Sequence, residues 1–124
     1  MSSNEFAIRY DGWFSALATP LWMGPRRAVV RVSDGVLTVR MGWAFRAEIP
    51  LASIRTVGPD SRSVSGFGVH GFGGYWLVNG SAKGLVRLEL EPFVRARAVR
   101  LPVRLRELRL SVSDPAAFLA AVGR

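Results

Sequence analysis

Residues 66–75, GFGVHGFGGY, contain a G-x-G-x-x-G pattern from Gly66 to Gly71, with His70, the only histidine of the chain, inside it. In dinucleotide-binding proteins such a loop follows a strand and opens a helix, whose N-terminus binds the pyrophosphate. Here a serine-rich stretch precedes the pattern, and residues 75–78, which resemble a strand, follow it. We interpret the match as coincidental and expect no cofactor. The sequence predicts a glycine-rich loop between two strands, with His70 at the surface or in a turn.

Nucleophilic catalysis needs a base within hydrogen-bonding reach of a nucleophile, and a third group that orients the base. The chain has a single imidazole and no cysteine, and no G-x-S-x-G sequence surrounds any serine. Glu89 and Glu91 would share one face of a strand with Arg87, which is typical of a solvated ladder of charges. One histidine without cysteine also gives no ligand set for zinc. We therefore expect no catalytic residue, no metal site and no enzymatic activity.

Arginine is the residue type that could bind a ligand. The net charge is +8, and Lys83 is the only lysine. Two pairs of arginines between residues 95 and 106 have a spacing of two, which places each pair on one face of an extended strand. Guanidinium groups bind phosphates of lipid or nucleic acid in a bidentate manner. The competing interpretation, which the alternation favours, is a solvated outer sheet face. The candidate phosphate ligands are Arg26, Arg27, Arg95, Arg97, Arg104 and Arg106.

A second candidate surface is residues 13–25, an uncharged and mostly apolar segment. It is shorter than the roughly 20 residues needed to cross a bilayer, and Pro20 interrupts it. Three roles stay open, in the order in which we rank them: a cover for the core, a contact between subunits, and insertion into a membrane interface beside Arg26 and Arg27. The residues concerned are Trp13, Phe14, Leu17, Leu21 and Trp22.

Length and composition define the broad class of protein. A chain of 124 residues can form one domain with its own core. A hydrophobic content of 49% with four tryptophans is typical of a folded protein. The first residues lack the basic and apolar regions of a signal peptide. We expect a cytoplasmic protein, and peripheral association with the inner face of the membrane is an open alternative.

The elements that must position these residues are short strands followed by one helix. Apolar and polar residues alternate with a period of two, and Asp34-Gly35 supplies a tight hairpin turn. The predicted strands are residues 30–33, 37–41, 45–51, 53–57, 75–78, 85–90 and 108–113, with further short strands over 6–10 and near 67–70. Residues 92–102 are less regular. Asp114 is expected to cap a helix from Pro115 to Gly123, with an apolar face containing Phe118 and Val122.

Two short motifs connect this order of elements to a known family. Residues 49–54 read Ile-Pro-Leu-Ala-Ser-Ile, an I-P-L-x-x-I segment, and residues 114–118 form a D-P-x-x-F helix start. Over residues 26–123 the chain resembles bacterial pleckstrin-homology-like (PH-like) domains. The resemblance implies a barrel of two nearly orthogonal antiparallel sheets, with about seven strands and a C-terminal helix that closes one end. Residues 1–25 would add a strand and an apolar cover to residues 26–124, giving one structural domain.

The resemblance implies a binding or scaffolding module rather than an enzyme. Family members that bind phosphoinositides use lysines and arginines around the first hairpin. Here Asp34-Gly35 forms the tip between Arg31 and Arg40, so we do not expect specific recognition of an inositol phosphate. The expected partner is another protein or a second copy of the chain, with anionic lipid as an open alternative and nucleic acid bound only weakly and without specificity. The alternative for fold and function together is an OB-like protein that binds single-stranded nucleic acid.

Overall fold

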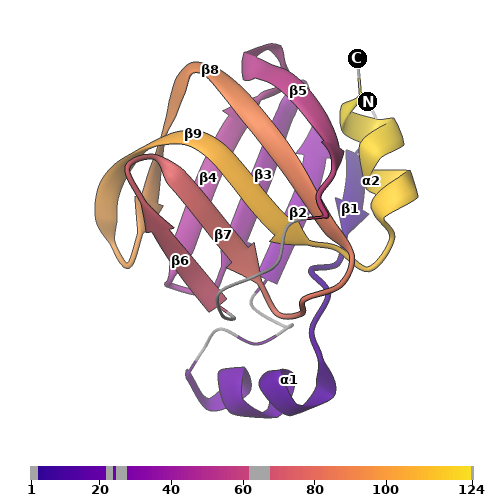
Figure 1. The fold of residues 1–124 in the computed structure, drawn as a ribbon, viewed down its shortest axis with the longest axis vertical. Helices are drawn as coiled ribbons and strands as arrows, with labels where there is room; N and C mark the ends of the chain where they lie inside the picture. The colour runs from indigo at the N-terminus through magenta and orange to yellow at the C-terminus, as the bar shows by residue number, and fades with distance from the viewer. Residues whose placement is uncertain (1–2, 22–23, 25–27, 62–67, 124) are drawn as a thin grey trace.

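The computed structural model describes residues 3–21, 24, 28–61 and 68–123, and strands make up most of it (Figure 1). The strands are β1 (Ser3–Phe6), β2 (Ala28–Ser33), β3 (Val36–Met41), β4 (Phe45–Pro50), β5 (Ile54–Pro59), β6 (Gly68–Phe72), β7 (Tyr75–Asn79), β8 (Leu85–Ala98) and β9 (Leu101–Ser111). The helices are α1 (Gly12–Ala18) and α2 (Pro115–Val122), with short 3-10 turns η1 (Thr19–Leu21) and η3 (Leu51–Ser53). Among the described residues, no helix is both long and apolar enough to cross a membrane.

The nine strands form one open sheet in the order β1-β2-β3-β4-β8-β9-β7-β6, and β5 pairs with β8 beside this path. Neighbouring strands are antiparallel except β7 and β9, which are parallel. β8 pairs with β5 through residues 86–90, with β4 through residues 96–98, and with β9 in both of these parts. The predicted mainly β class with a C-terminal helix is confirmed, and the described residues form nine strands where about seven, with two further short ones, were expected.

β8 and β9 share an irregularity that we call the corner. Between the pairs Glu89–Glu107 and Val94–Leu105, β8 contains residues 90–93 and β9 only Arg106. The backbone N–H groups of Arg106 and Glu107 both donate to the carbonyl of Gly74, at 2.8 and 3.1 Å. Such a bulge bends a strand and changes the face to which the following side chains point. Residues 92–102, predicted to be less regular, therefore continue β8 and begin β9, because the bulge accommodates a proline that has no N–H to donate.

The core lies between β2–β4 and the two long strands β8 and β9, which cross in front of them in Figure 1. Every second residue of β3 and β4 is buried, because successive side chains of a strand point to opposite faces. The largest fully buried side chains include Leu37, Met41, Phe45, Ile49, Leu88, Leu105, Leu108, Leu110 and Phe118.

The C-terminal helix α2 forms as the sequence predicts. The Asp114 side chain accepts a hydrogen bond from the backbone N–H of Ala117 at 3.2 Å, and a proline follows as the first helical residue. Phe118 and Val122 are buried, and the Phe118 ring meets Phe6 edge to face at 5.6 Å between centroids. The helix therefore covers the core beside β1 and β5 (Figure 1).

The N-terminal segment connects the β2 edge of the sheet with the residues that follow β7 and β9. β1 pairs with β2, and isolated bridges connect Ile8 to Val112 and Tyr10 to Gly80. The first strand thus lies earlier than the predicted residues 6–10, because only bridges follow it. Tyr10 lies against Gly80, where any Cβ atom would come within 2.7 Å of the tyrosine ring. Burial raises the pKa of the Tyr10 phenol above its usual range, so the side chain is neutral and structural.

Candidate functional site

Beyond the corner, arginines from four neighbouring strands lie on the outer face of the sheet. Arg40 of β3 lies opposite Arg46 of β4, and Arg46 lies opposite Arg97 of β8. One step further along β8, Arg95 lies opposite Arg104 of β9. All five residues are exposed. We call Arg40, Arg46, Arg95, Arg97 and Arg104 the arginine surface.

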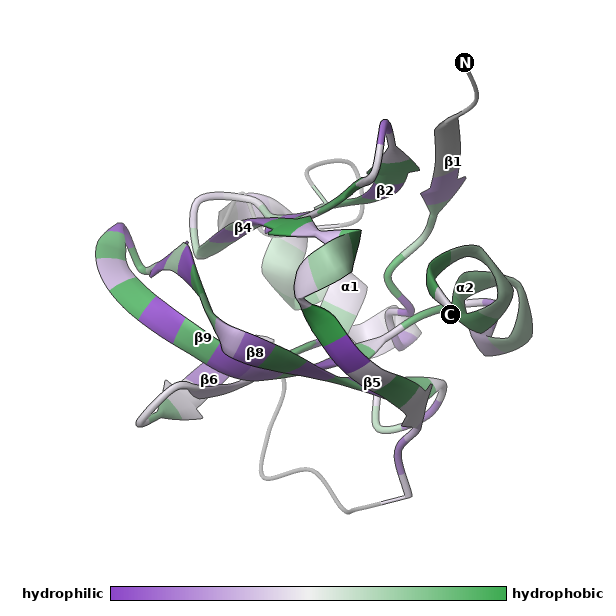
Figure 2. Ribbon diagram, turned by 90° about the horizontal axis from the view of Figure 1, so that it is seen from above, coloured by the Kyte–Doolittle hydropathy of each residue, from purple (hydrophilic) through white to green (hydrophobic). Residues whose placement is uncertain are grey.

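Local sequence alternation produces this face. Residues 95–98 read Arg-Ala-Arg-Ala, and both alanines are buried, as are Ala47 in β4 and Leu105 in β9. Directly opposite residues of paired strands point to the same face, so Ala47 and Ala96 meet inside while the arginines meet outside. Figure 2 shows the alternating hydrophilic and hydrophobic bands along β8 and β9. The arginines belong to paired strands and not to loops.

The arginine surface lacks neutralising partners. In the part of the chain that the structure describes, none of its five side chains forms an ion pair with a carboxylate. Glu48 shares the face, two residues from Arg46 on β4, without pairing to any of them. Like charges directly opposite each other destabilise a sheet. This face can therefore gain stability from an anion that binds across several guanidinium groups.

Two neighbouring groups orient arginines of this surface. The guanidinium of Arg104 lies over the ring of Phe93, 5.2 Å from its centroid. Arg97 donates from Nη1 to the backbone carbonyl of Arg100 at 3.3 Å. Neither contact uses all five N–H donors of the guanidinium group, so a phosphate oxygen can accept from the others.

The six predicted phosphate ligands divide into three groups. Arg95, Arg97 and Arg104 belong to the arginine surface. Arg106 is exposed at its border, with its guanidinium 6.0 Å from the Phe93 ring, and lines a hollow of 440 Å³ at the corner together with Glu89, Glu91 and Glu107. Arg26 and Arg27 lie outside the described residues. The sequence prediction missed Arg40 and Arg46, which only the pairing of β3, β4 and β8 brings beside Arg97.

The apolar segment that begins at residue 13 divides between core and surface. In α1, Phe14 is buried and its ring stacks on Tyr10 at 6.0 Å, whereas Trp13 and Leu17 are exposed. Leu21 ends the following turn η1, and Trp22 lies outside the described residues. The helix lies below the sheet, at the bottom of Figure 1. A cover for the core, the role that we ranked first, fits Phe14 but not the two exposed side chains.

From Gly68 onward, the glycine-rich stretch forms a hairpin. Gly68 and Gly71 lie in β6, and the turn Gly73-Gly74 leads directly into β7, so a strand and not a helix follows. A Cβ atom at Gly71 would come within 2.2 Å of the Trp76 ring, which lies opposite it on β7. This glycine therefore makes room for an aromatic side chain and does not cradle a phosphate.

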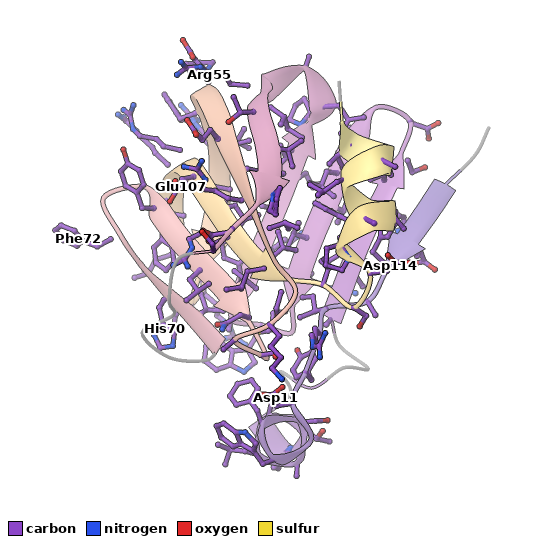
Figure 3. All side chains as sticks on the ribbon, turned by 45° about the vertical axis from the view of Figure 1, so that its right-hand side comes forward. Asp11, Arg55, His70, Phe72, Glu107 and Asp114 are labelled. Atoms are coloured by element: carbon purple, nitrogen blue, oxygen red, sulfur yellow. The ribbon has the colours of Figure 1, made fainter. Side chains whose placement is uncertain are left out.

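His70 is exposed on β6 and lines a hollow of 490 Å³ that also contains Glu107 and Arg109 (Figure 3). A histidine near a carboxylate is the arrangement that acid–base catalysis uses. Here Glu107 also pairs with Arg87 at 3.5 Å, and Arg109 pairs with Asp60. No serine, threonine or cysteine is found among the described residues that line this hollow, so it offers none of these nucleophiles.

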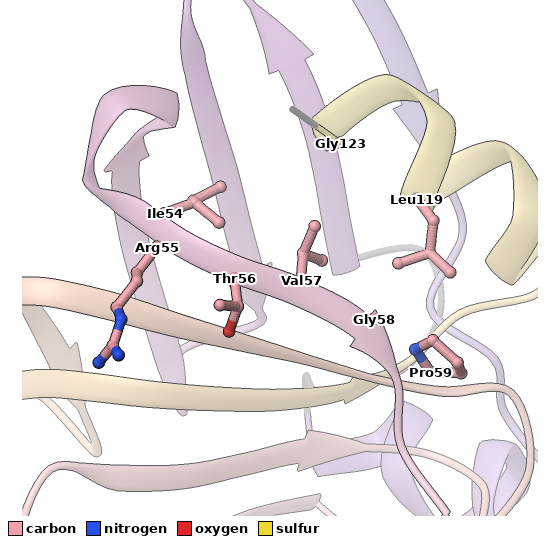
Figure 4. Close-up of a pocket in the computed structure, with 8 residues that line it drawn as sticks. All are labelled: Ile54, Arg55, Thr56, Val57, Gly58, Pro59, Leu119 and Gly123. Atoms are coloured by element: carbon pink, nitrogen blue, oxygen red, sulfur yellow. The ribbon is translucent and has the colours of Figure 1, made fainter.

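A further pocket of 360 Å³ lies between β5 and α2 (Figure 4). β5 lines it from Ile54 to Pro59, and Leu119 and Gly123 line it from the helix. Arg55 is the only charged residue among those that line it in the described chain, and it pairs with Glu91 at 3.6 Å. The pocket therefore has little polar chemistry with which to select a ligand.

No protein-family model, no curated protein sequence and no solved structure matches the chain. The choice of a candidate site therefore depends on the residues and their geometry. Among the described residues no group of three or more acidic or histidine side chains could hold a metal ion. The arginine surface is the feature whose charge the rest of the described chain leaves uncompensated.

Proposed function

We propose that this protein is a non-enzymatic PH-like binding module that attaches to anionic membranes through the arginine surface. The proposal includes the fold that the resemblance implies, two nearly orthogonal antiparallel sheets with α2 at one open end. The course of β8 supports it, because β8 pairs with β5 before the corner and with β4 beyond it. The corner would then be the bend from one sheet to the other.

The observation that carries the proposal is a set of five exposed arginines in register, without a carboxylate partner in the described chain. Nothing in the fold requires adjacent strands to present the same charge, and the repulsion costs stability. The surface spans four strands and is not a pocket for one small anion. A leaflet of anionic lipids presents many phosphates in one plane, and each arginine near it contributes about 1 kcal/mol of attraction.

Nucleic acid and self-association are less well supported at this surface. Proteins that bind single strands stack bases on exposed aromatic rings. Phe93 is half-buried, and the guanidinium groups of Arg104 and Arg106 already lie over its ring. Trp43 is exposed in the turn beside this surface, but one ring does not provide a series of rings on which successive bases could stack. A second copy would bring one net charge of +8 towards another, which opposes contact through the arginine surface.

Vesicle sedimentation tests the proposal with two double variants of equal net charge. Arg46→Gln with Arg97→Gln removes two members of the arginine surface. The matched control, Arg31→Gln with Arg55→Gln, removes two arginines that pair with Glu5 and Glu91. At low salt we expect the wild type to bind phosphatidylcholine vesicles only when they contain phosphatidylserine. The first variant should bind about 30-fold more weakly, because two contacts of about 1 kcal/mol are lost, and the control should change far less.

Three results would overturn the proposal. The first is a wild-type protein that does not bind phosphatidylserine vesicles, and the second is an equal loss of binding in both variants. The third is tighter binding to a single-stranded oligonucleotide than to vesicles, with an affinity that falls steeply with salt. The third result would favour the nucleic-acid alternative.

A further inference from the structure

In the part of the chain that the structure describes, three hairpins close with a two-residue turn in which both residues have positive φ. The φ values are 53° and 77° at Asp34-Gly35, 63° and 92° at Gly73-Gly74, and 51° and 66° at Val99-Arg100. Such turns favour Asn-Gly, Asp-Gly or Gly-Gly, since most side chains crowd the backbone in this conformation. The first two turns follow that rule. Val99-Arg100 does not, and a β-branched residue with positive φ is an outlier.

The third turn lies beside another turn of the sheet. The backbone N–H of Val99 donates to the carbonyl of Ala44 at 2.8 Å, which holds the β8–β9 turn against the β3–β4 turn. Large apolar side chains are exposed here: Trp43 is 44%, Val99 50% and Leu101 66% exposed. We call Trp43, Val99 and Leu101 the apolar tip.

Arginines surround the apolar tip. Arg40 and Arg46 lie on the two strands that the Trp43 turn connects, while Arg97 and Arg100 lie on either side of Val99. Neither residues 35–47 nor residues 92–106 contain an aspartate or a glutamate. The acidic turn Asp34-Gly35 lies at the opposite end of β3 from the Trp43 turn. One end of the molecule is thus apolar at its centre and basic at its rim.

We infer that the apolar tip inserts into the interface of an anionic bilayer while the arginine surface beside it binds lipid phosphates. The inference rests on the proposed function and adds the element that enters the membrane and the orientation of the sheet. Tryptophan and aliphatic side chains favour the interfacial layer, and arginines favour the phosphates above it. Backbone strain that the fold does not require is often found at functional sites. Insertion accounts for a valine where glycine or asparagine would fit the turn better.

A single fluorescent label tests insertion, because the chain contains no cysteine. Leu101→Cys places an environment-sensitive nitrobenzoxadiazole label at the tip, and Ala120→Cys places it on the exposed side of α2 as the control. With phosphatidylserine vesicles we expect a blue shift and quenching by nitroxide lipids at position 101 and neither at position 120. Co-sedimentation of the labelled protein without either change at position 101 overturns the inference.

A second pair of variants keeps every arginine. Val99→Ser with Leu101→Ser makes the tip polar, and Leu17→Ser removes an exposed apolar side chain of α1 as the control. Unchanged circular dichroism and thermal unfolding establish that each variant folds. The tip variant should lose affinity for phosphatidylserine vesicles by about tenfold, whereas the control should bind like the wild type. Wild-type affinity in the tip variant overturns insertion and leaves the proposed function standing. If the wild-type protein does not bind phosphatidylserine vesicles at all, both the insertion and the proposed function are overturned.

Discussion

The two parts of the β8–β9 hairpin, before and beyond the corner, solve the same electrostatic problem differently. Before the corner the register places Arg87 opposite Arg109 and Glu89 opposite Glu107, which are two pairs of like charges. Neighbours nevertheless neutralise them. The Nη1 atom of Arg87 lies 3.2 Å from Oε1 of Glu89 and 3.5 Å from Oε1 of Glu107. Arg109 forms an ion pair with Asp60. In this part of the hairpin the charges stabilise one another.

Beyond the corner the same two strands place Arg95 opposite Arg104, and β4 adds Arg46 opposite Arg97. The register again brings like charges together, but no ion pair to a carboxylate neutralises these four side chains within the described chain. A cross-strand pair of arginines is therefore not in itself a sign of a binding site. The missing counter-charge is the informative difference, and the predictions below test it.

The largest effect is expected before the corner, at the pair between Asp60 and Arg109, whose side chains are 3% and 13% exposed. Asp60→Asn removes the carboxylate that pairs with a largely buried guanidinium. Breaking a buried ion pair from one side costs about 3–5 kcal/mol, so urea unfolding should show a loss of this size. Replacing both residues, Asp60→Leu with Arg109→Met, should cost less than the single change. If Asp60→Asn lowers the free energy of unfolding by less than about 1 kcal/mol, the ion pairs do not stabilise the part of the hairpin before the corner as proposed.

A smaller effect of opposite sign is expected at the turn that ends the arginine-rich half. Val99→Asn with Arg100→Gly gives the turn residues that positive φ favours, and it should raise the free energy of unfolding by about 1–2 kcal/mol. Asp34→Asn is the matched control, since Asp-Gly and Asn-Gly suit such a turn equally and no gain is expected. Urea unfolding of the three proteins measures the difference. A double variant no more stable than the wild type would mean that Val99-Arg100 is not strained.

Local signals in the sequence predict the local elements correctly. The alternation over residues 30–51 and the Asp34-Gly35 turn match β2, β3 and β4 to within two residues at the ends, and the Asp114 cap begins α2 as expected. Each of these signals acts within a few residues, through the direction of side chains or a hydrogen bond to a nearby backbone group. The corner was missed because Pro92 usually interrupts a strand, and a bulge that tolerates it depends on the partner strand.

The arginine surface was predicted only in part for the same reason. The spacing of Arg95 and Arg97 is visible in the sequence, whereas Arg40 and Arg46 are some fifty residues away and reach them only through the pairing of β4 with β8. The apolar tip gives no local signal, because Trp43 and Val99 belong to different hairpins that one backbone hydrogen bond joins. Sites assembled by register need the fold before they can be recognised.

The smallest effect is expected from a single charge reversal, whose sign should differ between an arginine of the arginine surface and an arginine that has a carboxylate partner. Arg46→Glu places a carboxylate between Arg40 and Arg97 and should stabilise the protein by about 0.5–1 kcal/mol, because two opposite-charge cross-strand pairs replace two like-charge pairs. Arg31→Glu, the control, places a carboxylate against Glu5, the present partner of Arg31 at 3.1 Å, and should destabilise slightly. Urea unfolding at low and high salt measures both, and screening should shrink both effects. A gain at position 46 beside a loss at position 31 would mean that the arginine surface opposes the fold, as expected of a surface whose counter-charge comes from a ligand. A loss at both positions would instead make Arg46 an ordinary structural residue.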